Sequence, residues 1–153
     1  MKKKLKSFLL IIIAFLSSWF GYLNITDPAL IVSQTDIDKD IIISKIENNN
    51  SEIIYLKAGN DKFGLNHILK KHTRDFFPES KQKGNLFPSG TTGKQIIKGI
   101  ESVYRNGNND PNAYGNKTVL RYETKLNGKK GNYRLVINNQ NEIITFFRLK
   151  NKA

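Results

Sequence analysis

Two histidines, His67 and His72, lie five positions apart in the segment LNHILKKHTRDFF, residues 65–77, and they are the two histidines of the chain. Histidine is the side chain whose ordinary pKa lies near neutrality, so a close pair can supply one acid and one base at the same pH. The pair therefore predicts general acid–base chemistry. The alternative is that one histidine packs in the core while the other is a solvated residue at a helix end.

The spacing of the pair sets a geometric condition. Side chains five residues apart on an α-helix point about 140° away from each other. Both rings can therefore face one substrate group only if the helix ends near Lys71 and His72 turns back over it. The divergence also weakens a zinc interpretation, because paired zinc ligands on a helix are usually four residues apart with a carboxylate nearby. We expect no metal ligand and no cofactor.

The two histidines are not expected to be equivalent. His67 is favoured for the chemical role because its neighbours on the helix surface are polar. His72 is flanked by Lys71 and Arg74, whose charges should lower its pKa. A lowered pKa suits a base at neutral pH, and it suits a simple phosphate contact equally well.

Three cations and one aromatic residue are candidates for substrate binding. Arg121 and Arg134 occupy the middles of two predicted strands, where they would make one sheet face cationic and could hold a phosphate. Lys94 lies near the start of a predicted helix, and helix N-termini bind phosphate well. Phe147 could stack on a nucleobase. The alternatives are ordinary solvated cations and a core aromatic ring.

Two helices are predicted in the first half of the chain, after a strand in SEIIYLKAG, residues 51–59. The segment KFGLNHILKKH, residues 62–72, has one apolar stripe and room for about three turns at most. In TTGKQIIKGIESVYRNG, residues 91–107, Thr92 is a suitable N-cap and Gly107 follows the end of the helix.

The last third of the chain predicts antiparallel strands. Residues 118–149 form three alternating runs, separated by Asn127-Gly128 and by a turn from Asn138 to Asn141. We therefore predict an α+β fold with N-terminal helices packed on a C-terminal antiparallel β-meander.

The chain begins with a pattern typical of exported proteins. A lysine cluster at residues 2–6 precedes an uncharged run from Ser7 to Leu23, as in a signal peptide or signal anchor. By the positive-inside rule, the rest of the chain would be secreted, or held outside the cytoplasm by membrane anchoring through residues 1–23. The expected organisation is a leader at 1–23, a spacer at 24–50 and a single domain at 51–153.

Charge and cysteine content restrict the partners. The formal net charge is +12, and there is no cysteine and hence no disulfide to stabilise an exported domain. Nucleic acid, anionic membrane and acidic cell-wall polymer would all attract such a chain, because attraction to phosphate is independent of sequence. The alternative interpretation of the positive charge is an ordinary solvated surface with no polyanionic partner.

Three motifs in order resemble the bacterial EndoU-type nucleases, within the wider barnase, EndoU, colicin and RelE-like group of RNases and toxin domains. They are NHILKKH, then LFPSGTTGKQIIKGIESV with its Phe-Pro step into a helix, then GNYRLVINNQNEIITFFRL at the end. The resemblance covers roughly residues 60–150. Two features depart from the family pattern: residues 73–85 contain no second loop histidine, and the terminal Thr-x-Tyr is here Thr145-Phe146-Phe147.

The resemblance implies a role for Thr145, at the family position that contacts phosphate or base. Its side chain is expected to face the same way as Ile143 and Phe147, by the two-residue alternation of a strand. Metal-free RNA cleavage needs a base for the 2′-hydroxyl proton, an acid for the leaving 5′-oxygen, and a donor for the phosphoryl oxygens. His67, His72 and Thr145 are therefore the expected catalytic residues.

The expected function is an exported endoribonuclease that leaves 2′,3′-cyclic phosphate ends. RNA is the expected partner, joined by an immunity protein if the chain is an antibacterial toxin, as the family resemblance implies. The alternative is a non-enzymatic exported module that binds anionic polymer, lipid or nucleic acid. The histidine pair separates the two, because a binder has no use for a group that titrates near neutrality.

Overall fold

The computed structural model describes residues 27–77, 85–110 and 115–150, and in these segments the fold is α+β with three helices and antiparallel sheets. The helices are α2 (Pro28–Gln34), α3 (Gly64–His72) and α4 (Gly93–Asn106). The strands are β1 (Ile42–Glu47), β2 (Ile53–Lys57), β3 (Asn108–Asn109), β4 (Thr118–Leu126), β5 (Lys129–Ile137) and β6 (Ile143–Arg148).

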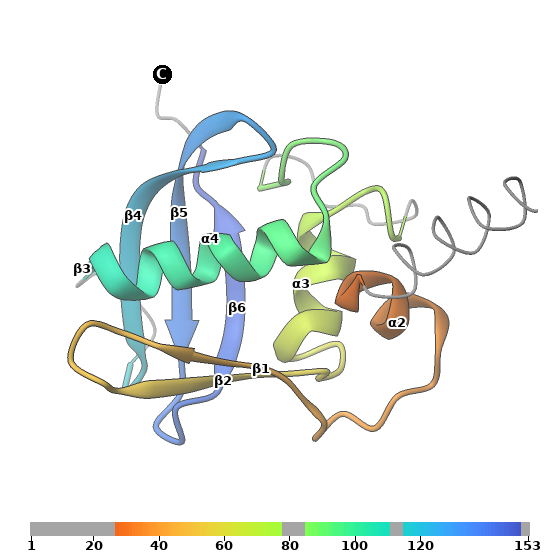
Figure 1. Ribbon diagram of the computed structural model, residues 1–153, viewed down its shortest axis with the longest axis horizontal. Coiled ribbons are helices and arrows are strands. Elements are labelled where there is room, and N and C mark those ends of the chain that lie inside the picture. The colour runs from red at the N-terminus through yellow and green to blue at the C-terminus, as the bar shows by residue number, and fades with distance from the viewer. Residues whose placement is uncertain (1–26, 78–84, 111–114, 151–153) are drawn as a thin grey trace, which may run out of the picture.

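The C-terminal strands form the predicted meander, in the order β3-β4-β5-β6 (Figure 1). Asn127 and Gly128 both have positive φ, at 46° and 74°, as a tight two-residue hairpin between right-twisted strands requires. The Asn138–Asn141 turn joins β5 to β6 and is closed by the side chain of Asn138. Both predicted hairpin turns are thus confirmed.

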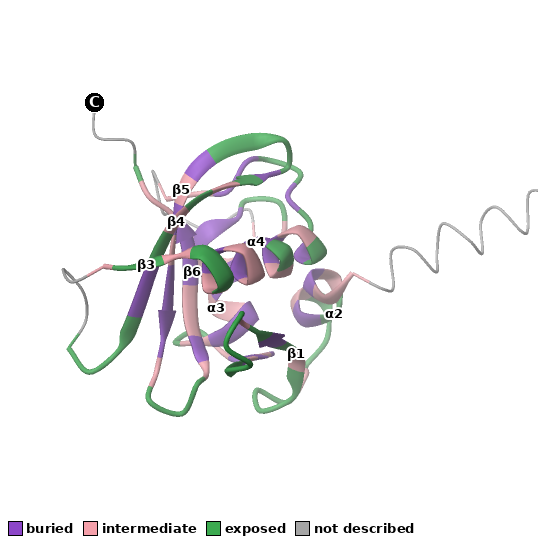
Figure 2. Cartoon of the chain, turned by 60° about the vertical axis from the view of Figure 1, so that its left-hand side comes forward, coloured by how far each residue is buried: buried purple, intermediate pink, exposed green. Residues whose placement is uncertain are grey.

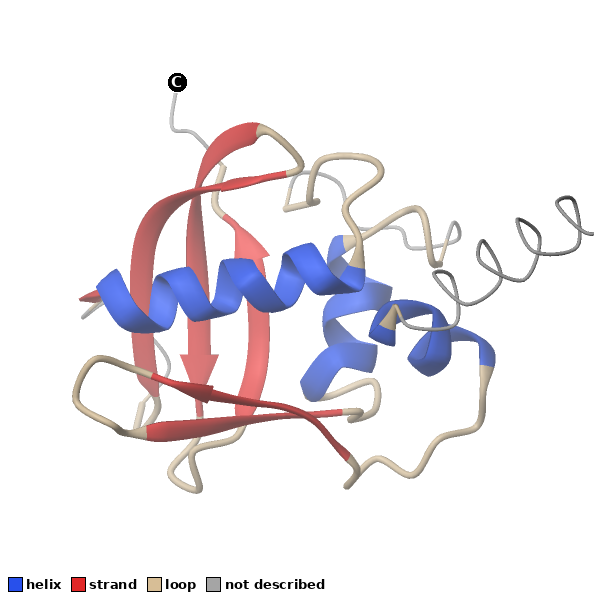
Figure 3. Cartoon of the chain, viewed as in Figure 1, coloured by secondary structure: helices blue, strands red, loops and turns tan. Residues whose placement is uncertain are grey.

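Helix α4 lies across one face of this sheet (Figures 1 and 3). It begins at the predicted N-cap, Thr92, whose side chain forms a reciprocal capping box with Gln95, and it ends at Gly107. Gly99 allows the helix to approach the sheet closely, since a Cβ there would lie 2.8 Å from the side chain of Leu126 and 3.1 Å from that of Phe146. The face of α4 toward the sheet is buried, and the hairpin turns are exposed (Figure 2).

Helix α3 packs beside the edge strand β6, and its apolar stripe is buried as predicted. Gly64 starts the helix with φ of 78°, in a tight crossing with the backbone of Gly59 that leaves no room for a side chain at either position. The helix ends at His72, where the hydroxyl of Thr73 donates to the carbonyl of Leu69 at 2.7 Å. These contacts fix both ends of the helix, which packs next to the edge strand β6.

A bulge in β6 changes which face its residues occupy. Ile143 pairs with Ile137, whereas Thr145 pairs with Val136, so Ile144 is an extra residue in the register. Ile143 is consequently in the main core, and Thr145 faces the opposite side of the sheet together with Phe147. The expectation that Ile143 faces the same way as Thr145 and Phe147 is therefore wrong, because simple alternation does not survive an inserted residue.

Residues 24–50, expected to be a spacer, contain α2 and β1. Ala29 and Val32 of α2 and Ile46 of β1 are buried in the core. The carboxylate of Asp27 caps α2 through the N–H of Ala29 at 3.0 Å and accepts a second hydrogen bond from the N–H of Gly93 at 3.2 Å. The packed part of the chain therefore starts by Asp27, well before residue 51.

The predicted leader at residues 1–23 lies outside the described residues. Within the described segments, no helix has the length and apolar character needed to cross a membrane.

Candidate active site

A cleft of about 280 Å³ lies where the end of α3 meets the outer face of β6, on the side of the sheet opposite α4. It collects residues from distant parts of the chain. The polar and aromatic side chains that line it are His67, His72, Asn85, Lys117, Thr145 and Phe147.

The two histidine rings meet in this cleft, with centroids 6.0 Å apart and ring planes at 76°. Because His72 is the last residue of α3, its side chain is free of the next helical turn and can lie toward β6. The geometric condition set by the i, i+5 spacing is met, with the helix ending one residue beyond Lys71.

His72 is held on both of its ring nitrogens. Nδ1 lies 3.2 Å from the carbonyl oxygen of Asn85, and Nε2 lies 3.2 Å from the hydroxyl of Thr145. A carbonyl can only accept, so we assign the ring proton to Nδ1. Nε2 is then an unprotonated nitrogen that accepts from Thr145 and faces the cleft.

Burial lowers the pKa of His72 to about 4, with a smaller contribution from the charge of His67. The Asn85 carbonyl acts in the opposite direction, and Lys71 adds to the lowering. The predicted direction is confirmed, but desolvation is the main cause and Arg74 does not contribute. At neutral pH, His72 is therefore a neutral imidazole.

His67 is half-buried and is oriented by the loop before α3. Its Nδ1 lies 2.7 Å from the carbonyl oxygen of Asp61, so the ring donates there and Nε2 remains for proton exchange. The carboxylate of Asp61 forms an ion pair with Lys70, which fixes the same loop against α3. Asp61 was not singled out from the sequence, since its role depends on its backbone carbonyl.

Phe147 packs against His72 and is not available to stack on a nucleobase. The two rings stack with centroids 5.2 Å apart and planes at 24°, and Phe147 is 7% exposed. Val119 and Val136 pack beside it in a small cluster on this face of the sheet. The ring face that could have met a nucleobase is covered by the imidazole.

The predicted cations lie outside the cleft. Arg134 binds Asp110 through Nη2 at 2.6 Å and Nε at 3.0 Å, and its guanidinium lies 5.9 Å from the centre of the Phe147 ring. Arg121 is directly opposite Arg134 on β4 and lines a different cavity. Lys94 is exposed in the first turn of α4 and does not line the cleft.

Among the residues that the structure describes, the cation that lines the cleft is Lys117, which immediately precedes β4. Sequence reasoning missed Lys117 and Asn85, as it missed Asp61. Neither has a local signal: Lys117 is one basic residue among many, and Asn85 acts through its carbonyl. Within the described part of the chain, no group of three or more His, Cys, Asp or Glu side chains is placed to hold a metal ion.

Comparison with models of known protein families and with curated proteins finds no match to this chain.

Proposed function

We propose that the chain is a metal-independent endoribonuclease whose active site is the cleft between α3 and β6. The observation that carries this proposal is the pair of histidines at its wall, one of which, His72, is buried, neutral and fixed on both nitrogens. An imidazole that is desolvated but opens onto a cleft is poised as a base.

The roles follow from the hydrogen bonds. The RNA 2′-hydroxyl displaces the hydroxyl of Thr145 from Nε2 of His72, and this nitrogen takes the 2′-hydroxyl proton. The 2′-oxygen bonds to phosphorus, and the bond from phosphorus to the 5′-oxygen breaks. His67, in its protonated form, gives its proton to the departing 5′-oxygen. The products are a 2′,3′-cyclic phosphate and a 5′-hydroxyl end. RNA supplies the nucleophile.

The remaining cleft residues stabilise charge and orientation. Lys117 would hold the phosphoryl oxygens as negative charge accumulates on them. Thr145 and the Asn85 carbonyl fix the plane of the His72 ring. A bound phosphate would also raise the low pKa of His72, which strengthens it as a base when substrate is present.

Cleavage of RNA but not DNA tests the proposal. The full chain, kept in mild detergent, is incubated in EDTA with an RNA and with a DNA of the same sequence. We expect RNA fragments with 2′,3′-cyclic phosphate ends and intact DNA, because DNA lacks the nucleophile. Cleavage of both would contradict the mechanism. Tight binding of both without cleavage would favour the polyanion-binding alternative.

A further inference from the structure

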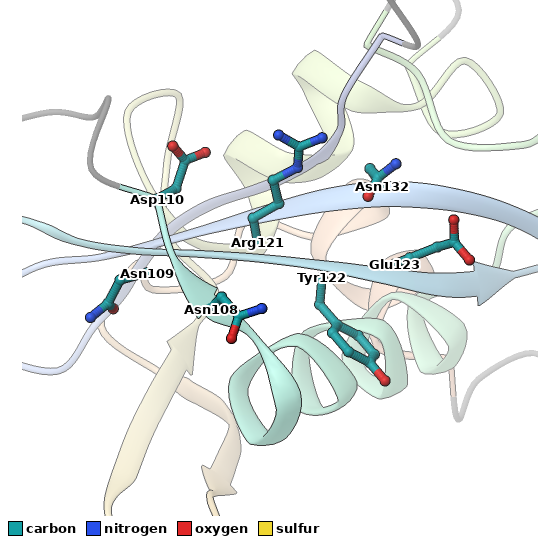
Figure 4. Close-up of a pocket in the computed structure, with 7 residues that line it drawn as sticks. All are labelled: Asn108, Asn109, Asp110, Arg121, Tyr122, Glu123 and Asn132. Carbon is teal, nitrogen blue, oxygen red and sulfur yellow. The ribbon is translucent and has the colours of Figure 1, made fainter.

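A second cavity, of about 430 Å³, lies along the strands β3, β4 and β5. Figure 4 shows its lining, in which Asp110, Arg121 and Glu123 point to one side of the strands and Tyr122 points to the other, toward α4. The polar lining side chains are those of Asn108, Asn109, Asp110, Arg121, Glu123 and Asn132.

The sheet register places this cavity beside the active-site cleft. Thr145 pairs with Val136, and Phe147 pairs with Arg134, which in turn pairs with Arg121. All lie on the sheet face opposite α4, so Arg121 and Phe147 are two strands apart, on the order of 10 Å. The ion pair of Arg134 with Asp110 lies between the two sites. One nucleotide is long enough to reach from the active-site cleft to this second cavity.

The chemistry of the second cavity differs from that of the cleft. The cavity combines Arg121 with the carboxylates of Glu123 and Asp110, of which Asp110 is already paired with Arg134. Its lining is therefore mixed in charge, unlike the cationic patch that phosphate favours. Its three asparagines offer both donors and acceptors. Such a lining suits an uncharged planar group with several hydrogen-bonding positions, which is the character of a nucleobase.

Arg121 and Glu123 together favour one base. They lie two residues apart on β4 and so project from the same face of the strand. Guanine presents acceptors at O6 and N7, which suit a guanidinium, and donors at N1 and N2, which suit a carboxylate. Lys130 lies 3.8 Å from Glu123, but both side chains are exposed, so that pair is weak.

We propose that this cavity is a guanine-binding subsite for the nucleotide adjoining the cleaved bond. The proposal rests on the nuclease function above and gives it a base preference.

The test is the variant Glu123→Gln in the full chain, with Glu101→Gln on α4 as the matched control. Two properties are measured: the base next to each cut in an RNA of random sequence, and the binding of guanosine and adenosine monophosphates by calorimetry. For the wild type and Glu101→Gln, we expect cuts next to guanine and preferential binding of the guanosine nucleotide. For Glu123→Gln, we expect at least about a tenfold loss of both preferences.

The outcomes separate this inference from the function on which it rests. Cleavage without base preference, or a preference unchanged in Glu123→Gln, overturns the guanine subsite while leaving the nuclease intact. Guanosine binding that Glu123→Gln weakens, in a chain that never cleaves RNA, supports the subsite and overturns the nuclease. Equal binding of both nucleotides by the wild type overturns the subsite in either case.

Discussion

His67 and His72 differ in burial, so their removal should have different consequences. His67→Ala should reduce the single-turnover RNA cleavage rate about 10²- to 10⁴-fold, the usual contribution of a positioned acid or base, with little change in stability. His72→Ala should reduce the rate similarly and also lower the free energy of unfolding by about 1–2 kcal/mol, because it removes a buried, hydrogen-bonded ring. If both folded variants kept the wild-type rate, the pair would be structural.

His72 should also make stability depend on pH. Its folded pKa is lowered from 6.5 to about 4, so the unfolded chain binds the proton more readily. The stabilisation is complete above pH 6.5 and is lost as the pH falls toward 4, by an amount on the order of 3 kcal/mol. Urea unfolding of the wild type and of His72→Gln across this range isolates the effect, since carboxylates titrate in both. Parallel stability curves for the two proteins would contradict it.

Residue types, together with the family resemblance, located part of the candidate site. His67, His72 and Thr145 were predicted and share one cleft, because histidine chemistry is visible in a sequence and the family resemblance indicated the threonine. Lys117 and Asn85 were missed because tertiary structure alone brings them to the histidines. Arg134 was expected to hold phosphate, but its guanidinium forms an ion pair with the carboxylate of Asp110.

At the scale of elements, the contact of α4 with the sheet depends on Gly99. Gly99→Val should destabilise the fold by about 1–3 kcal/mol or more, because the new side chain would overlap Leu126 and Phe146. Lys98→Val is the matched control, since it adds the same β-branched residue at an exposed position of the same helix. Chemical denaturation of both variants measures the difference. Because valine has a higher helix propensity than glycine, propensity alone would slightly stabilise Gly99→Val. A loss no larger than that of Lys98→Val would therefore contradict the packing role of Gly99.

Elements with local signals were predicted well, and elements without them were not. Helix α4 and the two C-terminal hairpins carry their own caps and turns, so their boundaries were visible in the sequence. Helix α2 has only seven residues, too few to show a helical period, and its apolar residues find their partners in α3 and α4, far along the chain. The bulge at Ile144 has no local signal, yet it decides which side of the sheet Thr145 faces.

For the whole molecule, we propose export directed by residues 1–23. We expect the chain, expressed at full length in bacteria, to be recovered outside the cytoplasm, either shortened at its N-terminus or in the membrane fraction. Replacing the lysines at positions 2, 3, 4 and 6 with glutamate should impair this export, because the positive flank sets the orientation of insertion. Cell fractionation with mass measurement decides the matter. A wild-type chain found wholly in the cytoplasm at its full mass would refute export.

The double hydrogen bond of Asp27 limits how far the domain can stand from a membrane. Because this carboxylate ties α2 to the start of α4, the folded unit begins no later than Asp27, four residues after Leu23. Four residues reach at most about 14 Å when fully extended. If the leader is retained as an anchor, the domain would lie close to the lipid headgroups, because no long flexible linker would separate the two. The domain would then meet its substrates within about 14 Å of the membrane surface. If the leader is instead removed, the protease would have to cut before Asp27 to preserve its two hydrogen bonds.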